Sequence, residues 1–100
     1  MKTDVEEFDL TQIPYVALRR MGTIFREGEG KYGRNNWRNG VDNTQYQLER
    51  LNHAMKHLAI YIHLLQFGED LGVPGEDNLA KVAWAMVTQM ELERVEDNEE

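Results

Sequence analysis

Three side chains able to bind a divalent cation recur at helical spacing in the middle of the chain. Glu49, His53 and His57 occupy positions i, i+4 and i+8. Each step of four residues drifts only about 40° around an α-helix, so all three fall on one face. A carboxylate and two imidazoles one turn apart suit a divalent metal ion. Solvent-facing histidines also reach this spacing by chance, so an ordinary polar helix face remains the alternative.

Two acidic pairs, Glu69-Asp70 and Glu76-Asp77, flank a turn-rich break after this helix. Acids at a helix start cap its free N–H groups, which explains Glu76 and Asp77. The helix dipole disfavours Glu69 and Asp70, because they follow a helix end. The sequence therefore predicts an oxygen-rich Mg²⁺ (or Mn²⁺) site. Its predicted ligands are Glu49, His53, His57, Glu69, Asp70, Glu76 and Asp77, with Glu49, His57, Glu69 and Asp70 as the catalytic candidates.

A loop rich in glycine, cations and aromatic rings, residues 29–40, precedes the same helix. Lys31 and Arg34 suit phosphate oxygens, and the faces of Tyr32 and Trp37 suit a nucleobase. The alternative is a structural connector whose aromatic rings pack against the end of a helical bundle. The charge distribution favours a small anion over a polymer. Net charge is −7 overall, but residues 14–66 carry +4 and the remainder −11.

Composition excludes several chemistries. The chain has neither serine nor cysteine, so Ser or Cys nucleophiles, disulfides and thiolate metal sites are excluded. The loop lacks the spacing of a phosphate-binding P-loop. Metal-assisted hydrolysis, in which a carboxylate or histidine takes a proton from the attacking water, is the enzymatic class that remains. No apolar run is long enough to span a membrane, and the acidic start is unlike a leader peptide, so we expect a cytoplasmic protein.

Hydrophobic periodicity predicts three helices that carry these groups, over residues 14–29, 44–67 and about 76–94, and no strands. Gly28, Gly30 and Gly33 are expected to end the first helix. In the second helix an apolar seam follows a 3-4 spacing typical of bundles and coiled coils: Leu48, Leu51, Met55, Leu58, Ile62 and Leu65. In the third, the predicted buried stripe is Leu79, Val82, Ala83, Met86 and Met90. The prediction is one all-α domain, residues 1–100, with mobile acidic ends at 1–10 and 94–100. Because the second half of the second helix is apolar on nearly all sides, the three-helix protomer should assemble into an oligomeric bundle, a dimer or a tetramer.

Several motifs in order resemble the dATP/dGTP diphosphohydrolase family of phages and prophages, which is similar to the MazG-like all-α pyrophosphatases. They are Ile13-Pro14, the segment Gly28 to Gly33 followed by Asn36-Trp37 and Gly40, Lys56-His57-Leu58, Gly68-Glu69-Asp70, and Leu79 to Trp84. The resemblance covers about residues 10–93. It implies an oligomeric, Mg²⁺-dependent enzyme that cleaves a (deoxy)nucleoside triphosphate, expected to be a purine dNTP, into monophosphate and pyrophosphate.

Carried over by position, the resemblance places Lys31, Asn36 and Trp37 at the nucleotide. It places His57, Glu69 and Asp70 at or near the metal. Relatives often carry histidines entering the third helix, where this chain has Asn78 and Lys81. The MazG-like relatives use E-x-x-E and E-x-x-D pairs on adjacent helices; the second helix has neither. The competing hypothesis is a non-enzymatic, oligomeric helical interaction module, for example a phage accessory protein.

Overall fold

The computed structural model describes residues 9–93. The predicted mobile ends therefore lie outside the described residues, except for positions 9 and 10. The all-α prediction is confirmed, because the described chain contains helices and no strand. A short 3-10 helix, η2 (Leu10–Gln12), leads into three α-helices, with a second 3-10 helix between the first two.

The first helix, α1 (Tyr15–Tyr32), extends three residues beyond its predicted end. Pro14 precedes it in an extended conformation, as expected for a residue that cannot donate a backbone hydrogen bond. Gly28 and Gly30 continue the helix instead of ending it. The end comes at Gly33, whose φ of 93° is readily adopted only by glycine.

The basic aromatic loop is ordered around η3 (Asn36–Gly40). Trp37 and Gly40 are buried there. A Cβ atom added at Gly40 would lie 2.7 Å from a ring carbon of Tyr46, so the loop approaches the next helix more closely than any side chain permits. Gln47 donates a hydrogen bond of 2.8 Å to the carbonyl of Gly40. These contacts fix the loop to the start of α2.

The second helix, α2 (Thr44–Phe67), has the predicted bounds. Its first turn is capped by Asn43, whose side chain accepts a hydrogen bond of 3.0 Å from the N–H of Tyr46. Gly68 ends it in the left-handed conformation. The third helix, α3 (Asn78–Leu92), is capped by Asp77, which accepts from the N–H of Ala80 at 3.1 Å. It ends two residues before the predicted limit, and residue 94 lies outside the described range.

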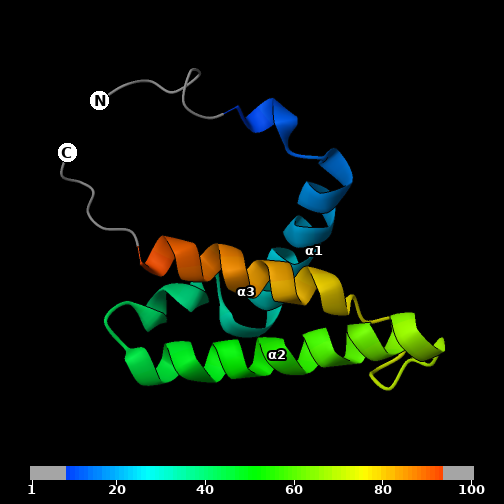
Figure 1. Cartoon of the computed structure of the whole chain (residues 1–100). Helices are drawn as coiled ribbons and strands as arrows, with labels where there is room; N and C mark the ends of the chain where they lie inside the picture. Colours follow the sequence, from blue (N-terminus) through cyan, green and yellow to red (C-terminus); the bar gives the residue numbers. More distant parts are fainter. Residues whose placement is uncertain (1–8, 94–100) are drawn as a thin grey trace.

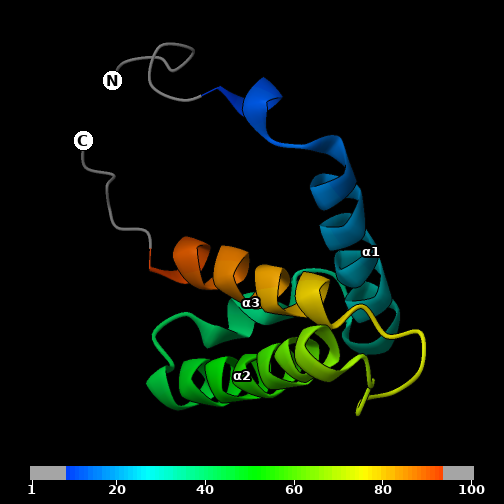
Figure 2. The same cartoon turned by 45° about the vertical axis from the view of Figure 1, so that its right-hand side comes forward.

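Helices α2 and α3 form an antiparallel pair that lies side by side in both views (Figures 1 and 2). The C-terminal half of α1 crosses this pair, and its N-terminal half projects away from it. Every residue from Tyr15 to Arg20 is accordingly exposed. Arg20, at the end of this exposed stretch, pairs with Asp77 at the start of α3.

The face of α2 that packs against α3 is not the apolar seam. Ala54 and His57 are the buried residues of α2, while Leu48, Met55 and Leu65 are more than half exposed. The stripe predicted for α3 is also wrong: Asn78, Ala80, Ala85 and Thr88 are buried, and Met90 is 65% exposed. Small and polar residues mark the contact because they let two helix backbones approach closely.

The buried apolar core is small for a chain of this length. It comprises Ile24, Trp37, Ala54, Ala80 and Ala85. No helix among the described residues is long and apolar enough to cross a membrane. The structure contains one chain and therefore does not test the predicted oligomer, which stays a prediction.

Candidate functional site

A cavity of about 700 Å³ opens where α1, η3, α2 and α3 meet. The end of α1 and the loop form one wall, the first half of α2 forms the second, and the start of α3 forms the third. Eight of the predicted site residues line it: Lys31, Tyr32, Asn36, Trp37, Glu49, His53, His57, and Glu76 from the segment before α3. The fold therefore brings the basic aromatic loop and the Glu-His face of α2 to one place.

Trp37 forms part of the cavity's rigid wall. Only 9% of it is exposed, and its ring meets Phe25 edge-on with centroids 6.5 Å apart. Phe25 in turn meets Trp84 of α3 at 6.1 Å. The guanidinium of Arg38 lies 4.4 Å from the centre of the Trp37 ring. These contacts make Trp37 part of the core, as the connector interpretation of the loop expects, while one edge of the residue still lines the cavity.

The other loop residues differ in exposure and partner. Lys31, Tyr32 and Asn36 line the cavity, and Tyr32 is 67% exposed at its mouth. Arg34 does not line it. Its side chain is 79% exposed and lies 3.6 Å from Glu29, a distance typical of a weak surface ion pair.

A short hydrogen-bonded chain crosses the cavity floor from α3 to α2. Nδ1 of the buried His57 lies 2.6 Å from Oδ1 of Asn78, and its Nε2 lies 3.1 Å from Nε2 of His53. An amide oxygen only accepts, so Nδ1 of His57 is the protonated nitrogen when the ring is neutral. Nε2 of His57 then accepts a hydrogen bond from Nε2–H of His53. Asn78 thus fixes the orientation and tautomer of both imidazoles.

The pKa of His53 is lowered from its usual value. Burial is the main cause, and the neighbouring His57, Lys56 and Lys81 act in the same direction, while Glu76 opposes them. His53 is therefore predominantly neutral at pH 7. This agrees with its role as a hydrogen-bond donor to His57.

Glu76 and Lys81 form an ion pair at the α3 side of the cavity, with Nζ 2.6 Å from the carboxylate. Both line the cavity. The hydrogen bond from Lys81 is the main reason that the pKa of Glu76 is lowered. Across the cavity, Glu49 accepts a hydrogen bond of 3.0 Å from Gln45. Its carboxylate is exposed and has no basic side chain as a partner among the described contacts.

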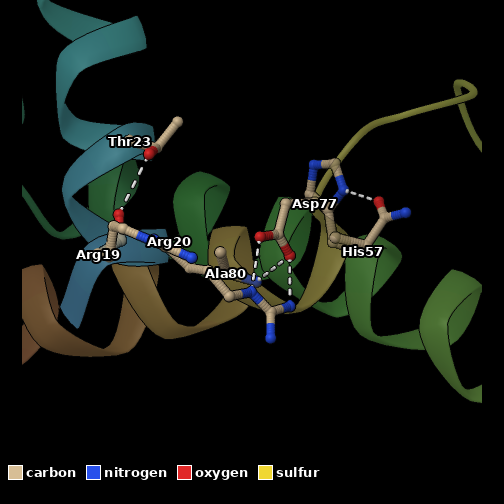
Figure 3. A network of polar contacts seen from close by, with 7 residues as sticks. Arg19, Arg20, Thr23, His57, Asp77 and Ala80 are labelled. Atoms are coloured by element: carbon tan, nitrogen blue, oxygen red, sulfur yellow. Dashed lines mark hydrogen bonds and ion pairs between the residues drawn. The ribbon is translucent and has the colours of Figure 1, made fainter. Parts of the chain in front are cut away.

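Three of the predicted metal ligands, Asp77, Glu69 and Asp70, lie away from the cavity lining, as Arg34 does. Both carboxylate oxygens of Asp77 are held by Arg20, at 2.8 and 2.7 Å, which ties α1 to the cap of α3 (Figure 3). Glu69 lies 3.1 Å from Nε2 of His63. Asp70 accepts a hydrogen bond from the N–H of Gly72 at 2.9 Å and so shapes the turn. Their predicted part in metal binding stays a prediction.

The described residues do not by themselves fit a resident metal ion. No group of three or more His, Asp or Glu side chains among them is arranged to hold one. The geometry gives the reason: both nitrogens of His57 are engaged, Glu76 is paired with Lys81, and Asp77 is paired with Arg20. Glu49 is the lining carboxylate of α2 and has no second carboxylate beside it.

Sequence reasoning missed two residues of this site. Asn78 was a departure from the pattern of relatives, yet it holds His57. Arg50 lines the cavity, and the aromatic rings of Tyr46 and Trp84 lie 5.8 and 5.0 Å from its guanidinium carbon. A signal existed for Arg50 alone: Arg50, Ala54 and His57 recur at i, i+4 and i+7, the helix face that packs against α3.

No curated protein and no solved structure is significantly similar to the chain. A family model described as dATP/dGTP diphosphohydrolase, N-terminal, matches residues 1–100. The match spans every element that lines the cavity, including the loop and the polar face of α2. The chain therefore belongs to the dATP/dGTP diphosphohydrolase family, whose members are enzymes that act on nucleoside triphosphates.

Proposed function

We propose that the cavity binds a purine deoxynucleoside triphosphate and that the protein hydrolyses it, with a divalent cation, to the monophosphate and pyrophosphate. The observation that carries this proposal is the meeting of two chemically different walls in one cavity. Aromatic and cationic side chains come from the loop, and a carboxylate and two imidazoles come from α2. A nucleotide has a flat base and a charged phosphate chain, which require these two kinds of surface.

The aromatic wall suits a base. Tyr32 at the mouth offers ring surface for stacking, Trp37 contributes an apolar edge of the wall, and Asn36 has an amide that donates and accepts hydrogen bonds. A purine has a larger ring system than a pyrimidine, so it gains more from such a surface. This is the basis for proposing a purine.

The charges of the lining favour a nucleotide that arrives with its metal. Three cations, Lys31, Arg50 and Lys81, face four carboxylates, those of Glu27, Glu29, Glu49 and Glu76. A bare triphosphate would be repelled by the carboxylates, whereas a complex with Mg²⁺ (or Mn²⁺) meets both signs favourably. We therefore propose that the divalent cation enters as part of the substrate complex. Glu49, whose carboxylate has no cationic partner among the described contacts, is the proposed acceptor of the proton released by the attacking water.

We also propose a homo-oligomer, a dimer or tetramer, in the cytoplasm. The buried core of one protomer consists of five apolar residues, while the exposed residues of the α2 seam include Leu48, Met55, Leu58, Ile62 and Leu65. Apolar side chains at this spacing are stabilised by a second helix. Association would remove this surface from water.

Pyrophosphate release from a panel of dNTPs and NTPs, measured with Mg²⁺, Mn²⁺ or EDTA, tests the activity. We expect metal-dependent release of pyrophosphate with a monophosphate product, fastest for a purine dNTP. No turnover by folded protein supplied with metal would refute the proposal.

A matched pair of variants tests the location of the site. Glu49→Gln should reduce turnover by about 100-fold or more, the contribution typical of a general base, with an unchanged circular dichroism spectrum. Glu69→Gln makes the same chemical change outside the cavity and should retain most of the activity. The opposite ranking would move the site to the break before α3, where the resemblance placed Glu69 and Asp70.

A further inference from the structure

Arg50 is a half-buried cation without an anionic partner among the described residues. Its Nε and Nη1 atoms are buried and make no hydrogen bond. Nη2 contacts the hydroxyl of Thr88, which is neutral. The remaining contacts of the guanidinium are with the rings of Tyr46 and Trp84. A half-buried guanidinium with two buried nitrogens that make no hydrogen bond is unfavourable unless something else provides the negative charge.

Of the other cations near the cavity, Lys31 is exposed to solvent, and three have a carboxylate nearby. Arg20 is paired with Asp77, Lys81 with Glu76, and Arg34 lies near Glu29. The net charge of the protein is −7, so carboxylates are plentiful. The carboxylate of the adjacent Glu49 bonds instead to Gln45. Arg50 therefore lines the cavity without a carboxylate partner among the described residues.

We propose that Arg50 binds the phosphate chain of the substrate. The nucleotide then supplies the negative charge that no carboxylate among the described residues provides. This inference rests on the proposed function, because it assigns the phosphate subsite of the same cavity to the wall formed by α2 and α3. Because Nε and Nη1 are enclosed in the free protein, this binding requires the side chain to change rotamer so that its N–H groups face the cavity that the residue lines. Once turned, the guanidinium can present a parallel pair of N–H groups, from Nε and Nη2 or from Nη1 and Nη2, a geometry that matches two oxygens of one phosphate.

A residue kept for a ligand is distinguished from a structural residue by its effect on stability. If Arg50 serves binding, replacing it with an apolar side chain of similar length relieves the cost of its burial in the free protein. Arg50→Met should therefore leave the unfolding midpoint unchanged or raise it. If Arg50 held the fold together, the same change would lower that midpoint.

The binding test uses inorganic tripolyphosphate with equimolar Mg²⁺, since this probe has phosphates but neither base nor sugar. Isothermal titration should show one site per chain in the wild type and an affinity roughly 10- to 100-fold lower for Arg50→Met, the loss expected for removing a charge-assisted pair of hydrogen bonds. Arg19→Met is the matched control, because it removes the same charge from the exposed half of α1. It should bind as the wild type does.

A measurement on the unaltered chain guards against a variant that does not fold. The Nε–H resonance of Arg50, assigned by its absence from Arg50→Lys, should be protected from exchange and should shift when tripolyphosphate and Mg²⁺ are added. Three results would each overturn the inference. They are an unchanged affinity for tripolyphosphate in Arg50→Met, an unfolding midpoint of Arg50→Met below that of Arg19→Met, and an Nε–H resonance that does not shift when the probe is added.

The outcomes separate this inference from the proposed function. A wild-type protein that binds tripolyphosphate through Arg50 but releases no pyrophosphate from any nucleotide would retain the phosphate subsite and refute the enzyme. Turnover of a dNTP, together with unchanged binding by Arg50→Met, would retain the enzyme and refute the role of Arg50.

Discussion

Replacing Asp77 should separate two contributions that this one side chain makes to stability. Its carboxylate caps α3 through the N–H of Ala80 and also binds Arg20 of α1 through two hydrogen bonds. Loss of a cap costs about 1 kcal/mol. The pair with Arg20 is 44% and 32% exposed, so solvent screening limits it to about 0.5–1 kcal/mol despite its two-point geometry. Asp77→Ala should therefore lower the free energy of unfolding by about 1.5–2 kcal/mol.

Asp77→Asn is the informative comparison. Asparagine caps a helix as well as aspartate does but cannot form the ion pair, so this variant should lose only about 0.5–1 kcal/mol. Arg20→Gln should lose a similar amount, and the double variant should lose no more than either single one. Urea denaturation at one fixed protomer concentration measures these differences. Equal losses of unfolding free energy in Asp77→Ala and Asp77→Asn would refute the division into a helix cap and an ion pair. Additive losses from Arg20→Gln and Asp77→Asn would refute it as well.

The same pair predicts a dependence on pH. The pKa of Asp77 is lowered, chiefly by the hydrogen bond from Arg20 and against the effect of burial. A lowered folded-state pKa means that the stabilisation is fully present above the unfolded-state value of about 3.9 and is lost as pH falls through the lower, folded-state value. The stability gap between wild type and Asp77→Asn should be constant from pH 5 to 7 and close below pH 4. A gap that persists at the lowest pH would contradict this assignment.

Three further changes test the packing of the site. Trp37→Ala should destabilise the protein by about 3–5 kcal/mol, measured by thermal unfolding, because the ring is buried against Phe25; a stable variant that only loses nucleotide affinity would contradict its place in the core. Ile62→Asp should shift the mass measured by light scattering to that of a single chain, and an unchanged mass would remove the α2 seam from the interface. Asn78→Ala should release His57, so the ¹⁵N shifts of its ring nitrogens should move toward an averaged tautomer; unchanged shifts would show that Asn78 does not set the tautomer.

The helices were predictable because their signals are local. Asn43 and Gly68 lie at the two ends of a strong apolar period, and the structure begins and ends α2 between them. The end of α1 was misplaced for the same reason. Gly28 and Gly30 read as helix breakers, but a glycine ends a helix only where the backbone must turn, and here that position is Gly33.

The site was predictable in part. The face shared by Glu49, His53 and His57 follows from helix geometry, and it does line the cavity. Which helix face would be buried did not follow, because an apolar seam is the stronger signal for burial, and periodicity does not say whether the partner lies in the same chain. The role of Asn78 was inaccessible for a different reason. Its contact with His57 joins two residues 21 positions apart.

On α2 the face that carries polar groups is buried and the apolar seam is exposed, and this arrangement connects the fold to the function. A helix has one face to offer to α3, and here that face carries Arg50, Ala54 and His57, two of which are ionisable. Because this face packs against α3, the apolar residues of the seam stay exposed in the protomer: Leu48, Met55, Leu58, Ile62 and Leu65. An isolated chain would gain little from this arrangement. It becomes favourable when the apolar seam is covered by association, because the interior of the protomer is then free to hold polar groups around a ligand. The polar cavity and the proposed self-association would then both follow from the orientation of α2 about its own axis.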